Sequence, residues 1–319
     1  MAQAIPDSLK HGHELLQRSM PKAHIIEGTD LTIVEVWKAQ LLALLETQAS
    51  SPGERAERLI SDTYVPYPAL WASYFFGNVS EFSKWATEAL PHLLEPSHPA
   101  WRFAFELEME NLLLPIASRT GAMLGRRPEG IWHLFYGPHG DMGGTPEGIV
   151  WANLRVIADE REPMEYLRFL LPHELSHLVL WRTLKALPPI EAFSLLHLMV
   201  IEGVCCYFSY KYWECEHAPS KNTLFSEEDW RWCVTHERQI VRQAITDLGS
   251  SSWRTLNAYH RAGMRPWPDA PSRLAYFIGF RICETYVREH GPESWKEIYH
   301  QPVEETLTKS RYLESLELA

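Results

Sequence analysis

The feature that most constrains this chain is a short pattern near its middle, His173-Glu174-Leu175-Ser176-His177. Two histidines four residues apart lie one turn apart on the same face of a helix, so both imidazoles can reach one metal ion. Glu174 falls on the same side of such a helix, where its carboxylate can contact a water bound to the ion. The motif therefore predicts a zinc site with His173 and His177 as ligands and Glu174 as general base.

The residues around this motif favour a buried helix. Large apolar side chains occupy positions 169–171 and 178–181. Buried histidine and glutamate side chains need partners, so a chance match on a surface helix explains this context poorly. Pro172 removes a backbone donor and predicts either a helix start at the motif or a kink there. Both possibilities leave the two histidines in one turn.

A catalytic zinc ion usually has three protein ligands, and the motif supplies two. No histidine occurs at 178–187, so the third ligand must lie further along the chain. Glu202 is the favoured candidate, because a carboxylate in the apolar stretch 198–208 needs a cation or a proton. A buried arginine is the alternative partner for it. His197 is the competing candidate for the ligand role, and Glu191 is a weaker one.

Composition limits the class of protein. The net charge of −11 argues against binding to nucleic-acid phosphates and against docking on an anionic membrane surface. No apolar run has the length of a membrane span or of a secretory signal. The five cysteines are an odd number and include no C-x-x-C pair. We therefore expect a cytoplasmic protein with reduced thiols.

The spacing of apolar residues predicts a mostly helical α+β chain. Helical spacing occurs in the first half at 31–47, 54–60 and 99–117. Two strands that we expect to pair antiparallel, separated by a glycine-rich loop, are predicted at 131–137 and 149–158. Later helices are predicted at 164–185, 189–214, 226–248, 271–290 and 292–300.

This order of elements suggests a division near residue 130. A helical N-terminal region, 1–130, would pack on a zincin-like catalytic region, 131–319, unless the two form one continuous domain. A small antiparallel sheet would then precede the metal-binding helix. An exposed strand at 149–158 would be able to hold an extended peptide through backbone hydrogen bonds, so a peptide or protein substrate is the expected partner. The oligomeric state stays open.

Hydrolysis also needs a donor for the oxyanion of the tetrahedral intermediate. Tyr276, in the predicted helix 271–290, is the first candidate for this donor. A tyrosine that only fills the core is an equally good interpretation of the same residue. Tyr259 and His260, just before that helix, are the alternatives.

Three segments carry a family resemblance: Leu171-Pro-His-Glu-Leu-Ser-His177, Ile201-Glu-Gly-Val-Cys-Cys-Tyr-Phe208 and Tyr276-Phe-Ile-Gly-Phe280. From about residue 35 onward the chain resembles the bacterial predicted zinc-dependent proteases of domain of unknown function 2268. The resemblance implies a gluzincin-like core, one zinc ion held by His173, His177 and Glu202, and Glu174 as general base. Many gluzincins have an aspartate four residues after the glutamate ligand, which orients a zinc-binding histidine. Cys206 stands there in this chain, so that histidine needs a different partner.

Three hypotheses follow. The leading one is a cytoplasmic zinc metallopeptidase. The second is a non-catalytic regulatory or binding protein on a peptidase-like scaffold, which is motivated by Cys206. The third is a zinc hydrolase that acts on a non-peptide amide or ester. Zinc content and hydrolysis of peptides distinguish them.

Overall fold

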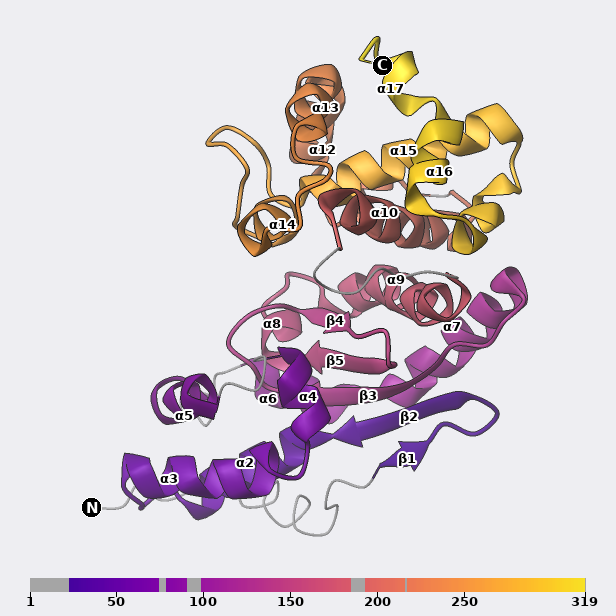
Figure 1. Cartoon of the computed structure of the whole chain (residues 1–319). Coiled ribbons are helices and arrows are strands. Elements are labelled where there is room, and N and C mark those ends of the chain that lie inside the picture. Colours follow the sequence, from indigo (N-terminus) through magenta and orange to yellow (C-terminus); the bar gives the residue numbers. More distant parts are fainter. Residues whose placement is uncertain (1–22, 75–78, 91–98, 185–192, 216, 319) are drawn as a thin grey trace. The chain divides into compact units, whose positions relative to one another are not determined.

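The computed structural model describes residues 23–74, 79–90, 99–184, 193–215 and 217–318 (Figure 1). The described chain is mostly helical and contains one small mixed sheet, which confirms the predicted α+β class. It divides into two compact units, Met1–Arg119 with Arg127–Arg168, and Thr120–Arg126 with Phe169–Ala319. The division near residue 130, which the order of predicted elements suggests, stays a prediction.

The sheet lies in the first unit. Its strand order is β1-β2-β3-β5-β4, formed by His24–Ile25, Asp30–Glu35, Glu129–Phe135, Ile149–Asn153 and Met142–Gly144. β2, β3 and β5 are parallel, while β1 and β4 pair antiparallel at the two edges. In the parallel part, Ile33 is level with Trp132 and Trp132 with Val150. All three side chains are buried, so the register aligns apolar residues across the inner strands.

The prediction of an antiparallel pair at 131–137 and 149–158 is wrong. The loop between these strands contains β4, which pairs antiparallel with β5 and returns the chain so that β5 runs parallel to β3. β5 is therefore an inner strand, and the predicted peptide-binding edge at 149–158 is wrong as well. The strand also ends early, at Asn153, because Leu154–Ala158 forms helix α8. The Asn153 amide bonds Gly137 and Gly140, which fixes the loop after β3.

The prediction of helix is also wrong at 31–35, which form β2. Thr32, Ile33 and Val34 are β-branched and suit a pleated surface. Pairing of β2 with β3 along its whole length decides the conformation of this segment, and helix α2 begins only at Val36. The other helices of this unit are α2 Val36–Glu46, α3 Pro52–Leu59, η1 Ile60–Tyr64, α4 Pro68–Tyr74, α5 Val79–Glu88, α6 Pro99–Glu106 and the first part of α7 Met109–Leu124.

The second unit is helical throughout its described residues. Helix α9 (Pro163–Thr183) enters it at Phe169 and continues through Pro172, so the helix does not start at the motif. Helix α10 (Leu195–Tyr212) is capped by Ser194, and the earlier start predicted at 189 lies outside the described residues. The remaining helices are α11 Pro219–Asn222, α12 Glu227–Thr235, α13 Glu237–Ile245, α14 Trp253–His260, α15 Leu274–His290, η4 Ser294–His300, α16 Val303–Ser310 and α17 Tyr312–Ser315.

Helices α10 and α15 cross at two glycines (Figure 1). A Cβ atom on Gly203 would lie 2.1 Å from the carbonyl carbon of Gly279. A Cβ atom on Gly279 would lie 1.8 Å from the carbonyl oxygen of Met199. Only glycine at both positions allows the two backbones to approach this closely. The approach fixes α10, which carries part of the candidate site.

Candidate metal centre

Helix α10 presents a polar stripe to helix α9. Glu202, Cys205, Cys206 and Ser209 have the spacing i, i+3, i+4 and i+7, which places them on one face. Ser209 donates a hydrogen bond of 2.9 Å to the carbonyl oxygen of Phe169 in α9. Most of the other residues of the helix are apolar and buried, with His197 and Lys211 near its two ends as polar exceptions. A buried helix must direct its polar groups toward partners, and here the partners are in α9.

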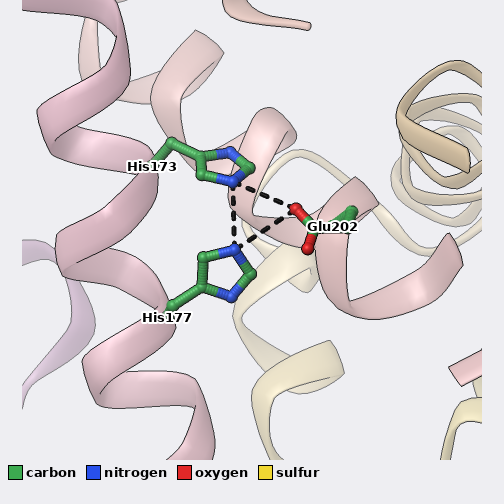
Figure 2. Close-up of side chains that lie close together, drawn as sticks. All are labelled: His173, His177 and Glu202. Atoms are coloured by element: carbon green, nitrogen blue, oxygen red, sulfur yellow. Dashed lines mark hydrogen bonds and ion pairs between the residues drawn. The ribbon is translucent and has the colours of Figure 1, made fainter. Parts of the chain in front are cut away.

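Three potential ligand atoms meet between these helices (Figure 2). The Nε2 atoms of His173 and His177 are 3.0 Å apart. The Oε2 atom of Glu202 lies 3.1 Å from the first and 3.3 Å from the second. The three side chains are buried, and within the described part of the chain they form a group suited to holding one metal ion. The structure thus brings together the three residues that the sequence suggests as ligands.

The geometry of the three atoms fits a cation. Zinc bonds of about 2.0–2.1 Å in a tetrahedral arrangement separate ligand atoms by about 3.3 Å. When each imidazole carries its proton on Nδ1, both Nε2 atoms and the carboxylate oxygen point lone pairs at the same space. Such an arrangement of buried acceptors is unfavourable unless a positive charge lies among them. Two imidazole nitrogens and one carboxylate oxygen are a known ligand set for zinc.

The other polar atom of each ligand has its own partner. The Sγ atom of Cys206 is 3.6 Å from Nδ1 of His173, and that of Cys205 is 3.2 Å from Nδ1 of His177. The remaining Glu202 oxygen, Oε1, lies 3.5 Å from Nε2 of His260 in α14. Cys206 therefore occupies the position at which an orienting aspartate would be expected. The ion-pair partners of Glu202 in the described chain are histidines, so the alternative of a neutralising arginine is not realised there.

The environment shifts the pKa values of these groups. Burial lowers the pKa of His173, although its hydrogen bond to Glu202 opposes this. Burial also disfavours charge on His177, but its contacts with Cys205 and Glu202 outweigh burial and hold its pKa well above the usual range. Burial similarly opposes charge on Glu202, yet His177 and the histidine hydrogen bonds keep the pKa of its carboxyl well below the usual range. Burial raises the pKa of both Cys205 and Cys206.

Tyr276 and His260 lie beside the cluster. The ring of Tyr276 stacks against His173 at a centroid distance of 5.9 Å and against His260 at 5.4 Å. Its hydroxyl is 3.1 Å from Nε2 of His260. Tyr259 points elsewhere, because its hydroxyl donates to Asp247. Of the three candidate oxyanion donors, the structure therefore places two near the cluster.

The remaining candidates have other positions. Glu174 is buried on α9, but it is not one of the three converging groups. His197 takes part in the cap at the start of α10, where its Nδ1 atom lies 2.7 Å from the hydroxyl of Ser194. Glu191 lies outside the described residues.

Sequence reasoning missed Cys205 and Trp181. Trp181 stacks on His177 with a centroid distance of 5.2 Å, and Cys205 contacts the Nδ1 atom of the same imidazole. The signal for Trp181 was its position four residues after His177, on the same side of α9. The signal for Cys205 was the stripe that it forms with Glu202 and Cys206.

Comparison with known proteins gives one finding that bears on function. A family model described as gliding motility protein GldB matches residues 175–314. The match includes His177, Glu202, His260 and Tyr276, but it begins after His173 and Glu174. It covers less than half of the 319 residues, so it establishes a similarity to this family. Searches among curated proteins and among solved structures gave no match.

The GldB match corrects the family and the activity expected from the sequence. The resemblance to the proteases of domain of unknown function 2268 is wrong, because the family that matches is one of gliding motility proteins. The prediction of a zinc metallopeptidase is contradicted by the same finding. The physical reason is that H-E-x-x-H requires only that two imidazoles can share an ion. Such a pair serves a structural metal as well as a catalytic one.

The expected cytoplasmic location is wrong as well. The matched family carries the label GldB_lipo, which points to lipoproteins of the cell envelope. Lipoproteins in general are held at a membrane by a covalently attached lipid, which requires no apolar helix. In the described chain, no helix is long and apolar enough to cross a membrane.

Proposed function

We propose that this chain is a non-catalytic, zinc-binding protein of the cell envelope that serves gliding motility or a closely related process. The observation that carries the proposal is the match to the gliding motility family across residues 175–314. That stretch contains His177 and Glu202, two of the three side chains that converge on one point. The metal would stabilise the second unit by joining α9 to α10, and the protein would act through binding partners.

The metal part of the proposal rests on the three converging atoms. Their separations of 3.0, 3.1 and 3.3 Å suit the ligands of one zinc ion. Within the described chain, the ion pairs of the buried Glu202 carboxylate are with histidines, and none is with a lysine or an arginine. The proposal keeps one part of the predicted gluzincin-like core, the helix pair α9 and α10 with its two histidines and one glutamate. This pair would hold the metal without hydrolysing a substrate.

The absence of catalysis is the second part. It rests on the family match, because thiol contacts at His173 and His177 would leave a bound ion at least as strong a Lewis acid as carboxylate contacts would.

Complementation in the organism that encodes the chain tests the proposal. A deletion strain would receive the wild type, Glu174→Gln, or His177→Gln. We expect the wild type and Glu174→Gln to restore surface spreading, because Glu174 is not one of the converging ligands, and His177→Gln to fail. Zinc analysis of the purified proteins should find about one ion per chain in the first two and a loss in the third.

Two outcomes would refute the proposal. Failure of Glu174→Gln to restore spreading, with its zinc content intact, would show that hydrolysis is needed. A wild-type protein that is purified without zinc, and that does not take it up, would remove the metal centre. Fractionation of the same strains tests the location, and recovery in the soluble cytoplasmic fraction alone would contradict an envelope protein.

A further inference from the structure

Each imidazole of the cluster is contacted on its far side by a cysteine. Cys205 and Cys206 are consecutive residues of α10, about 100° apart around the helix axis. His173 and His177 are one turn apart on α9. The consecutive thiols therefore reach one imidazole each, at 3.2 Å for Cys205 with His177 and 3.6 Å for Cys206 with His173.

The thiols themselves are outside the group of potential ligands. Each Sγ atom contacts Nδ1, whereas the shared point is faced by Nε2 on the opposite side of the ring. In the described chain, the group that can hold one ion contains His173, His177 and Glu202, with neither cysteine. The cysteines consequently act on the metal only through the imidazoles.

We propose that Cys205 and Cys206 are positioning residues of the metal centre, which fix the ring orientation and the tautomer of the two histidine ligands. A metal ion at Nε2 requires the ring proton on Nδ1, and each sulfur lies where it can accept that proton in a hydrogen bond. Both thiols are fully buried, so water does not compete for the contact. The inference rests on the metal centre proposed above.

A thiol in this role has a distinct chemical consequence. Carboxylates that hold the second nitrogen of a metal-bound histidine raise the basicity of the ring, whereas a neutral sulfur is a weak acceptor. The sulfurs therefore orient the rings while adding little negative charge to a site that already contains Glu202.

Zinc binding by single variants of the whole chain tests the inference. Cys205→Ala and Cys206→Ala should each weaken zinc binding by about tenfold to a hundredfold, as measured by competition with a chromophoric chelator. The absorption spectrum of the cobalt-substituted protein should change, because the imidazoles lose their fixed orientation. The unfolding temperature of the metal-free variants should fall no more than that of the control Cys233→Ala. Cys233 is a buried cysteine in α12, away from the cluster.

A rescue variant separates positioning from packing. Cys206→Asn supplies a carbonyl oxygen that can accept the Nδ1 proton of His173, and it should bind zinc within a few fold of the wild type. Cys205→Ser and Cys206→Ser serve if an alanine variant does not fold. The shorter bond of serine draws the hydroxyl away from the ring, so zinc binding should again weaken.

Failure of the inference can be distinguished from failure of the metal centre. If the wild type binds zinc and both alanine variants bind it equally well with unchanged cobalt spectra, the cysteines do not position the ligands. A loss of affinity equal to that of Cys233→Ala would overturn the inference in the same way, since it would reflect general packing. A wild type that binds no zinc would instead overturn the proposed metal centre.

Discussion

At the scale of single residues, the two carboxylate oxygens of Glu202 have different partners. Oε2 faces His173 and His177, while Oε1 faces His260. One oxygen is thus directed at the shared point and the other is held by a neighbouring helix. A carboxylate held in this way can bind an ion without first reorganising.

Glu202→Gln should remove the metal while leaving the fold of α10 intact. The amide is nearly isosteric but uncharged, so zinc affinity should fall by more than the roughly tenfold to hundredfold that outer contacts contribute. His197→Gln is the matched control, because His197 lies on the same helix but caps its start. Zinc titration by calorimetry measures both, and equal affinities for the two variants would contradict Glu202 as a ligand.

The pKa shift of His177 predicts how zinc stabilisation depends on pH. Its pKa is raised above the unfolded value of about 6.5, so its proton stabilises the metal-free fold at low pH. That contribution to the free energy of unfolding is lost as the pH rises through the folded pKa. Zinc replaces the proton, so the zinc-induced rise in unfolding temperature should increase as the pH rises from about 6.5 into the alkaline range. Scanning calorimetry with and without a chelator measures it, and a rise that shrinks over this range would contradict the assignment.

At the scale of elements, the position of α10 depends on its crossing with α15. The two backbones approach each other at Gly203 of α10 and Gly279 of α15. Gly203 directly follows Glu202 in the chain. Helices ordinarily pack with their axes 8–10 Å apart or so, as set by the side chains between them, and glycine pairs allow the closest approach. The same crossing therefore packs the core of the second unit and positions Glu202, the proposed metal ligand.

Gly203→Ala should destabilise the second unit and also weaken zinc binding. The new Cβ atom would meet the Gly279 backbone at 2.1 Å, so the helices must separate, at a cost of about 1–3 kcal/mol or more in the free energy of unfolding. Gly249→Ala is the control, because its Cβ atom would have nothing within 4 Å. Urea unfolding should show a change of less than about 1 kcal/mol for the control. Equal stability of the two variants would show that the close crossing is absent.

At the scale of the whole molecule, the candidate site lies in one of the two compact units. All three converging side chains belong to Phe169–Ala319, whereas the sheet belongs to the other unit. Binding of an ion to the folded state stabilises the region that unfolds with its site. A bound metal ion should therefore stabilise the second unit more than the first.

Hydrogen exchange should show that localisation. Zinc should slow exchange of amides in α9 after Phe169 and in α10. Their free energy of opening should rise by up to about 4 kcal/mol when the zinc concentration exceeds the dissociation constant a thousandfold. Amides of β2, β3 and β5 should change little. Mass spectrometry of peptides from zinc-loaded and chelator-treated protein compares them in one experiment. Equal added protection in the sheet would mean that the two units unfold together.

How much could be predicted from the sequence differs between helices and strands. The helices at 54–60 and 164–185 follow from local periodicity, and the structure places α3 and α9 there. The segment 31–35 has the same local pattern, but pairing with β3 makes it a strand. The direction of β5 depended on β4, a three-residue strand within a glycine-rich loop, for which the sequence carries almost no signal.

The sequence by itself determined which residue types could hold an ion. Histidines one turn apart, and a carboxylate in an apolar helix, need a cation or a proton wherever those helices pack, because burial of such groups without one is unfavourable. The tertiary structure decided which atoms meet: the glycine crossing, the thiol on each imidazole and His260 on the second carboxylate oxygen. These contacts join residues 28 to 76 positions apart in the sequence, from His177 with Cys205 to Gly203 with Gly279, and contacts between such distant residues are set by packing that no local pattern encodes.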